Sequence, residues 1–198
     1  MDKEIAKQFL LRVTSIMEEY GISVFISDGT CLGAYREQDF IEWDNDIDII
    51  ARAEELIPCM DILKERFEKE GCDVRSLYYG EFNHHGFILG FKRVRMDMHG
   101  MYLIHGKRWR LKGQITGKKT TCAYPAEWFK NSDQIEFLGR KFFIPTPVEK
   151  YLESLYGNDY MIPKNIKPKR HLLRYRAKYI HDQIKVKDIP RFKMKEGG

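Results

Sequence analysis

The 198-residue sequence has no uninterrupted hydrophobic run that approaches the roughly 18–20 residues needed to cross a bilayer. It begins with the charged run MDKEIAKQF, and no apolar signal region follows. The four cysteines show no CxxC spacing, so neither a zinc ribbon nor a dithiol redox motif is indicated. Internal repeats and low-complexity tracts are also absent. We therefore expect a cytoplasmic globular protein with free thiols.

The positive charge of the chain is concentrated at one end. The sequence has 34 Lys and Arg against 29 Asp and Glu, a net charge of +5, yet residues 164–198 alone carry 12 basic and 3 acidic residues. The preceding residues are mildly acidic, which argues against an extended nucleic-acid surface. We predict a folded domain over residues 1–163 and a basic C-terminal segment over 164–198, helical at 171–185 and frayed from 186.

Hydrophobic periodicity predicts an α+β fold, a small mixed β-sheet flanked by helices. An apolar stripe at helical spacing runs through residues 3–20, and Gly21 follows it. A helix with Pro147 at its first turn is expected to end before Gly157. The residues between Trp109 and Trp128 show no clear pattern. The other expected elements are strands at 22–28, 44–50, 72–79, 86–93 and 95–104, helices at 30–37 and 53–70, and a hairpin at 135–145 that turns at Leu138–Arg140.

Acidic and aliphatic residues alternate in the run DNDIDII at 44–50. On a strand, Asp46 and Asp48 project from one face, with Asp44 by the same parity, while Ile47 and Ile49 face the core. Three neighbouring carboxylates repel each other, and a bound Mg²⁺ or Mn²⁺ removes that conflict because both are hard cations that prefer oxygen ligands. The alternative is a solvated acidic edge.

A glycine turn precedes this acidic run. Gly29 and Thr30 follow a predicted strand and open a short helix, 17 positions before Asp46. Backbone N–H groups at such a turn, together with the Thr30 hydroxyl, suit phosphate oxygens. The alternative is an ordinary tight turn. If the two strands are neighbours, the turn and the carboxylates bring phosphate and metal together.

The segment from the glycine turn to the acidic run resembles the LicD family, whose members share the form GTxLGxxRxxxxIxWDxDxDI. This sequence reads GTCLGAYR at 29–36 and FIEWDNDIDI at 40–49, and YPAEWF at 124–129 and YLESLYGNDYMIP at 151–163 are also similar. The resemblance implies a nucleotidyltransferase-like fold and an enzyme of the LicD or fukutin type. Such enzymes move phosphocholine or an alditol phosphate from a CDP-activated donor to a glycan hydroxyl and release CMP.

Nucleotidyltransferase-like sites usually add a third carboxylate from a neighbouring strand, and the best candidate is Asp97. The resemblance thus implies that Asp46, Asp48 and Asp97, with Asp44, hold Mg²⁺ or Mn²⁺, and that Asp97 also serves as general base. Gly29 and Thr30 would bind phosphate. Arg36 would neutralise the charge that develops on the leaving CMP.

Further polar and aromatic residues are candidates with a plain structural alternative. Lys92 and Arg93 either meet the nucleotide phosphates or form the solvated end of a strand. His99 shares the face of Asp97 and either binds substrate or packs. The remaining substrate candidates are Trp43, in the apolar surroundings of the acidic strand, and Asp159, which otherwise caps local backbone.

Two other functions remain open at the level of sequence. The first keeps the fold but transfers a nucleoside monophosphate from an NTP to a protein, an RNA or a small molecule. The second is a binding module that uses the basic segment, for which an anionic membrane suits better than nucleic acid. A membrane contact would place the enzyme at the inner face, close to a lipid-linked glycan acceptor.

Overall fold

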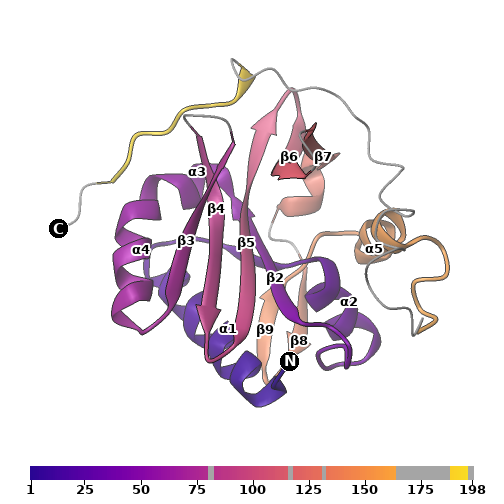
Figure 1. Cartoon of the computed structure of the whole chain (residues 1–198). Coiled ribbons are helices and arrows are strands. Elements are labelled where there is room, and N and C mark those ends of the chain that lie inside the picture. Colours follow the sequence, from indigo (N-terminus) through magenta and orange to yellow (C-terminus); the bar gives the residue numbers. More distant parts are fainter. Residues whose placement is uncertain (80–82, 116–117, 131–132, 164–187, 196–198) are drawn as a thin grey trace.

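The computed structural model (Figure 1) describes residues 1–79, 83–115, 118–130, 133–163 and 188–195. The helices are α1 Lys3–Glu19, α2 Asp28–Arg36, α3 Ala53–Leu56, α4 Met60–Lys69 and α5 Val148–Tyr156, with 3₁₀ turns η1 Ile57–Cys59 and η2 Ala126–Phe129. The strands are β1 Val24–Ile26, β2 Asp46–Arg52, β3 Asp73–Tyr79, β4 Asn83–Phe91, β5 Val94–Ile104, β6 Lys107–Ile115, β7 Lys118–Pro125, β8 Gln134–Phe137 and β9 Arg140–Phe143.

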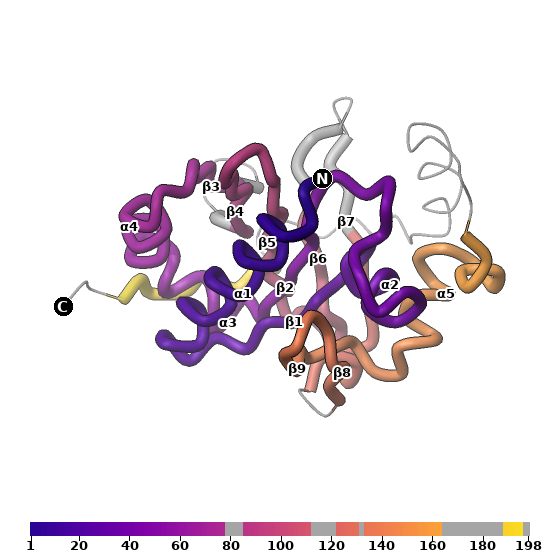
Figure 2. Tube along the Cα trace, turned by 90° about the horizontal axis from the view of Figure 1, so that it is seen from below, coloured from indigo at the N-terminus to yellow at the C-terminus, as the bar shows by residue number. Residues whose placement is uncertain are grey.

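The described strands form one mixed sheet in the order β3-β4-β5-β2-β1-β9-β8, and β6 and β7 extend it from the far half of β5. β2 runs parallel to β5, and β1 runs parallel to β9 but antiparallel to β2. Helices α1, α3 and α4 lie behind the sheet in Figure 1, whereas α2 and α5 lie together beside β2 (Figures 1 and 2). The α+β fold expected from the sequence is confirmed.

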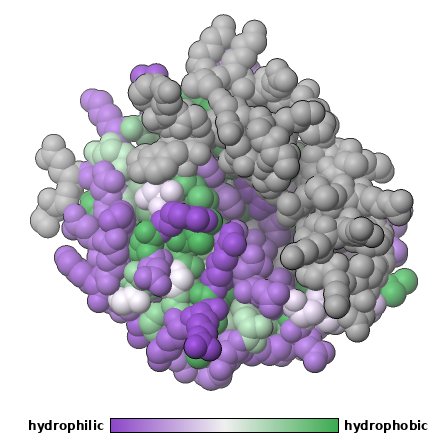
Figure 3. Space-filling view, in the orientation of Figure 1, coloured by the Kyte–Doolittle hydropathy of each residue, from purple (hydrophilic) through white to green (hydrophobic). Residues whose placement is uncertain are grey.

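The two faces of the sheet differ in chemistry. Ile47, Ile49, Met96 and Met98 are fully buried beneath the helices, as their alternation predicts. The residues between them on β2 and β5 point to the opposite face. Figure 3 looks onto that face, where hydrophilic side chains lie beside an apolar patch. The candidate site therefore lies on the face of the sheet that α1, α3 and α4 do not cover.

Local sequence explains most helix and turn boundaries. The Asp2 carboxylate accepts a hydrogen bond from the Ile5 N–H at 3.0 Å and caps α1, whose apolar stripe is buried. The β8–β9 turn falls at Leu138 and Gly139, both at positive φ, as expected. The single helix expected over 53–70 was wrong: it is interrupted at Pro58, which lies in η1 and has no N–H to continue an α-helix.

The region between Trp109 and Trp128 is a hairpin, β6–β7, rather than irregular chain. The run RWRLK at 108–112 alternates polar and apolar residues, so a local signal for β6 was present in the sequence and was missed. In the structure both faces of β6 are buried, with Arg108 and Arg110 on one face and Trp109 and Leu111 on the other. Arg108 is paired with Glu54, with N–O distances of 2.5 and 2.6 Å.

The end of the basic segment contacts the domain. Residues 188–195 were expected to be frayed, but Ile189 is buried in the core, the Phe192 ring lies 6.0 Å from that of Tyr102, and the Lys195 N–H donates to the Pro58 carbonyl at 2.7 Å. The helix expected at 171–185 lies outside the described residues. Among the helices of the described ranges, none is both long and apolar enough to span a membrane, and all four cysteines are buried free thiols.

Gly86 on β4 is required by close packing against β5. A Cβ at this position would overlap the Met98 carbonyl oxygen, and its φ of +155° disfavours other residues. We expect Gly86→Ala to lower the free energy of unfolding by about 2–3 kcal/mol in urea denaturation. Gly90→Ala on the same strand, where the nearest atom is the Asp73 Cβ at 3.4 Å, is the control and should change stability by less than about 1 kcal/mol. Equal losses in both variants would contradict this account.

Candidate active site

The parallel pairing of β2 with β5 brings three carboxylates together. Asp48 is the register partner of Asp97, and Asp46 is the partner of Arg95. Directly paired residues on adjacent strands point to the same side, so Asp46, Asp48 and Asp97 share the uncovered face of the sheet. The placement of Asp97 on the strand next to the acidic strand agrees with the sequence prediction.

Asp44 lies close to these carboxylates, but it is in a loop and not on the strand as expected. β2 begins only at Asp46, so Asp44 does not follow the parity of the strand. It lies in the preceding loop, with its carboxylate above the start of α2. A Cβ at Gly29 would overlap the Asp44 carboxylate, so glycine at this position allows the loop to close over the helix.

The glycine turn holds the acidic strand. The Gly29 N–H donates to Asp48 Oδ2 at 3.3 Å, and the Asp48 N–H donates to Thr30 Oγ1 at 2.9 Å. The Thr30 side chain is buried. In this structure the two residues that sequence reasoning assigned to phosphate fix the position and orientation of Asp48.

Burial, and after it the crowding of negative charge, raises the pKa values of Asp44, Asp46 and Asp48. Burial and the charge of Asp46 raise the pKa of Asp44 to about 7. Burial and the charge of Asp97 raise the pKa of Asp46, and burial followed by the charges of Asp28 and Asp46 raises that of Asp48 well above its usual range. The arrangement thus stores electrostatic repulsion that a cation would relieve.

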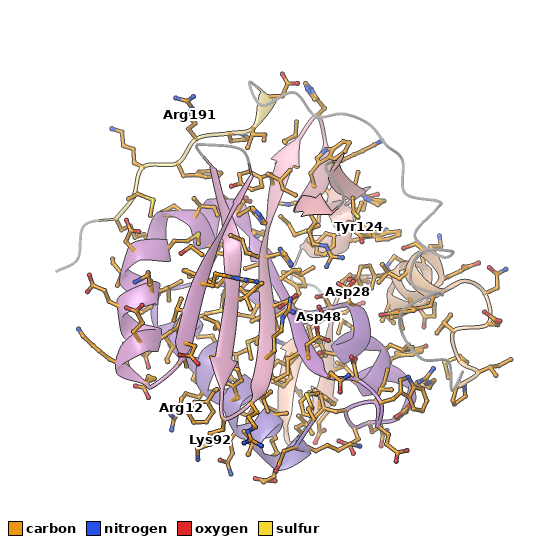
Figure 4. All side chains as sticks on the ribbon, in the orientation of Figure 1. Arg12, Asp28, Asp48, Lys92, Tyr124 and Arg191 are labelled. Carbon is orange, nitrogen blue, oxygen red and sulfur yellow. The ribbon has the colours of Figure 1, made fainter. Side chains whose placement is uncertain are left out.

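Asp28 is a site residue that sequence reasoning missed. Its carboxylate forms a two-pronged ion pair with Arg110 of β6, with Arg110 Nη2 2.9 Å from Asp28 Oδ1, and both side chains are buried. Its N–H donates to the Tyr151 hydroxyl at 3.2 Å, and its φ is +41°. Figure 4 shows Asp28 beside Asp48, with Tyr124 above. The available signal was a polar residue placed between a buried strand and a glycine turn.

Several predicted site residues are not brought to the carboxylates. Arg36 lies at the opposite end of α2 from Gly29, about 10 Å along the helix, where its Nη1 donates to the Tyr160 carbonyl at 2.9 Å. Lys92 and Arg93 form the exposed β4–β5 turn at positive φ. Figure 4 shows Lys92 at the far end of that hairpin, near Arg12 and away from Asp48.

The three substrate candidates lie in different surroundings. His99 is on the face of Asp97, half-buried, and its ring stacks on that of His85 with centroids 5.8 Å apart. Trp43 is half-buried against the core in the loop before β2. Asp159 is exposed in the turn after α5, where its carbonyl accepts from the Ile162 N–H at 2.9 Å. Of these three residues, only His99 lies on β5 and on the same face as Asp97.

The four carboxylates of the site are ligands of the kind that a hard divalent cation prefers. Asp44, Asp46, Asp48 and Asp97 offer only oxygen atoms, and their mutual repulsion is the conflict that Mg²⁺ or Mn²⁺ removes. Across the described ranges, however, no group of three or more His, Cys, Asp or Glu side chains is arranged to hold a metal ion. The Asp97 carboxylate is engaged by Arg95, with Nε–Oδ1 and Nη2–Oδ2 distances of 2.6 and 2.7 Å.

A short helix starts beside the carboxylates of β2, and a further carboxylate lies on the neighbouring strand β5, as the nucleotidyltransferase-like fold implied by the family resemblance requires. In agreement, the structure is similar to lincosamide antibiotic adenylyltransferase LnuA bound to lincomycin, with a TM-score of 0.50 and 12% sequence identity over 85% of this chain and 94% of that chain. At this identity the likeness concerns the fold alone.

The family model "LicD/FKTN/FKRP, nucleotidyltransferase domain" matches residues 21–147, and the chain belongs to this family. The matched range contains Asp28, Asp44, Asp46, Asp48 and Asp97, together with Arg95 and Arg110. The family predicted from the sequence is therefore confirmed.

Curated relatives match most of this chain at low sequence identity. The human ribitol-5-phosphate transferase FKTN is 25% identical over 177 residues, 81% of this chain, and its mouse counterpart is 26% identical over 174 residues, 80% of this chain. These alignments cover 34% and 33% of the relatives, so this chain spans about a third of their length.

Two neighbouring aspartates of the site should respond oppositely to neutralisation. Asp28→Asn leaves the buried Arg110 charge without its partner and should lower the free energy of unfolding by about 3 kcal/mol. Asp48→Asn removes a repelling charge and keeps an oxygen for the Gly29 N–H, so metal-free protein should be as stable as wild type or more stable. Thermal and urea unfolding in EDTA measure both.

The double variant Asp28→Asn/Arg110→Met serves as the control because it removes both charges of the buried pair. It should recover part of the stability lost in Asp28→Asn. A destabilised Asp48→Asn together with an unaffected Asp28→Asn would reverse our assignment of which aspartate is structural.

Proposed function

We propose that the chain is a metal-dependent phosphotransferase that moves a phospho-alcohol from a CDP-activated donor to a hydroxyl of a glycan or glycan precursor and releases CMP. The observation that carries the proposal is the Asp48–Asp97 register on a face shared with Asp46, within the residues matched by the LicD/FKTN/FKRP family. Carboxylates grouped in this way suit the binding of a metal-complexed diphosphate.

A divalent cation bound by Asp46, Asp48 and Asp97, with Asp44, would neutralise the donor diphosphate and stabilise the charge of the departing CMP. The Gly29–Thr30 turn keeps Asp48 in position through its two hydrogen bonds to that residue. The start of α2, close to the carboxylates, favours negative charge on the donor. The chain thus contributes positioning and electrostatics, which dominate phosphoryl transfer.

In the proposed step, the acceptor hydroxyl oxygen forms a bond to the phosphorus that carries the alcohol. The bond from that phosphorus to the bridging oxygen breaks, and CMP leaves with this oxygen. Asp97 takes the hydroxyl proton as general base. His99, two residues further along β5 on the same face, is in position to contact the acceptor or the transferred alcohol.

The proposal extends to the identity of the transferred alcohol and of the acceptor. Ribitol 5-phosphate, which the human and mouse relatives carry in their names, and phosphocholine are the candidates for the transferred group. We retain a lipid-linked glycan as candidate acceptor. Most of the basic segment that would contact an anionic membrane, residues 164–187, lies outside the described residues, so the membrane contact and the cytoplasmic location stay predictions.

The donor class is tested with CDP-ribitol, CDP-glycerol, CDP-choline and the four NTPs, each with Mg²⁺ and with glycan acceptors. We expect CMP release from one CDP-alcohol, loss of release in EDTA, and recovery with Mg²⁺ or Mn²⁺. CMP is quantified by chromatography alongside pyrophosphate. Pyrophosphate release from an NTP would instead establish a nucleotidyltransferase and overturn the proposed donor.

The proposed ligands are tested by removing one charge at a time. Asp48→Asn and Asp97→Asn should lower the rate of CMP release at least about 100-fold, since each removes a group that holds the metal–diphosphate complex. Asp61→Asn, an exposed aspartate on α4 behind the sheet, is the matched control and should retain wild-type rates. Wild-type rates in Asp48→Asn would contradict the assigned site, and its thermal stability shows that the fold is intact.

A further inference from the structure

Arg95 is an exposed cation in direct contact with one of the carboxylates. Strand register places it opposite Asp46 on β2 and two residues before Asp97 on the same face of β5. Its guanidinium binds Asp97 through two parallel hydrogen bonds of 2.6 and 2.7 Å. This hydrogen-bonded pairing, with added attraction to Asp46 and Asp48, raises the Arg95 pKa. Arg95 therefore acts as counter-ion to the carboxylate group in the absence of metal.

The second arginine of the region has a different status. Arg110 is buried, with 4% of its side chain exposed, and both of its terminal nitrogens are engaged by the buried Asp28. Arg95 has 52% of its side chain exposed, whereas its partner Asp97 has 17%. An exposed arginine can leave its partner at low cost, because surface ion pairs contribute little free energy.

Arg95 and a metal ion compete for the same oxygen atoms. Both Asp97 oxygens accept hydrogen bonds from Arg95, so a divalent cation that takes Asp97 as ligand displaces the guanidinium. The displaced group stays attached to β5 beside the carboxylates. Its planar fork of donors, freed from a carboxylate, matches two oxygens of a phosphate.

We propose that Arg95 exchanges partners: it holds Asp97 when no metal is bound, and it binds a phosphate of the incoming diphosphate once a divalent cation has taken Asp97. The exchange rests on the proposed function, to which it adds a donor-binding residue and an order, metal before donor.

Metal binding is measured first, with Mn²⁺ alone and the 198-residue chain, by isothermal titration calorimetry. Arg95→Ala removes the competitor, so its affinity for Mn²⁺ should rise about two- to fivefold over wild type. Arg75→Ala is the matched control, because Arg75 is an exposed arginine on the same face and in the same register row as Asp97, with Ile88 between them. It removes the same charge and should leave Mn²⁺ affinity unchanged.

Donor binding is measured next, with CDP in saturating Mg²⁺. Arg95→Ala should bind CDP about tenfold more weakly than wild type, because it lacks the bidentate contact to phosphate. Arg95→Lys, which keeps the charge but not the fork, should fall between the two, and Arg75→Ala should equal wild type. Opposite effects on the two ligands form the signature of the exchange, and thermal unfolding verifies that each variant is folded.

The outcomes separate the exchange from the proposed function. If wild type binds Mn²⁺ and Arg95→Ala binds it equally or more weakly, or if Arg75→Ala changes affinity to the same extent, the exchange is overturned while the metal site stands. If Mn²⁺ binding rises but CDP binding is unchanged, Arg95 is a counter-ion only and its donor role is overturned. If neither wild type nor Arg95→Ala binds Mn²⁺, the metal site and the exchange fall together.

Discussion

The parallel pairing of β2 with β5 is the contact on which the site depends. It sets Asp48 against Asp97 and Asp46 against Arg95, so one register determines which carboxylates repel and which is neutralised. The opposite faces of the same strands bury Ile47, Ile49, Met96 and Met98, and this burial is what holds the register. Hydrophobic packing behind the sheet therefore maintains an electrostatically unfavourable arrangement in front of it.

Two arginines, Arg110 and Arg95, partly neutralise the negative charge of the site's aspartates. Arg110 is buried and bound to Asp28, so it is part of the fold, and its positive charge lies close enough to lower the pKa of Asp48 against the larger effect of burial. Arg95 is exposed and bound to Asp97, so it is replaceable. In the exchange that we propose, the fixed cation stabilises the fold, and the exchangeable cation neutralises Asp97 until a metal takes its place.

The parts of the site that were readable from sequence are those set by local geometry. The alternation of Asp46 and Asp48 with Ile47 and Ile49 fixes their faces on any strand, and Met96 and Met98 do the same for Asp97. Hydrogen-bond and ion-pair partners that are far apart in the sequence could not be predicted from it. Nothing local indicates that Asp28 pairs with Arg110 82 positions away, or that Arg36 turns to Tyr160 at the far end of α2. The β6–β7 hairpin is a different case, because the alternation of RWRLK at 108–112 was readable and was missed.

β5 has two sets of neighbours along its length. It is paired with β4 from Val94 to His99 and with β2 from Arg95 to Met101, and from Met101 to Ile104 it is paired with β6. The first half thus carries Asp97 to the carboxylates, and the second half places the strand that delivers Arg110 to Asp28. The spacing between the exchangeable Arg95 and the fixed Arg110 is therefore set by the number of β5 residues between Arg95 and Met101, the register partner of Arg110. An insertion or deletion between residues 97 and 101 would displace both halves of the site relative to each other. A length change in the turn between β5 and β6 would shift the register that places Arg110 opposite Met101, whereas one in the turn between β4 and β5 would leave this spacing untouched.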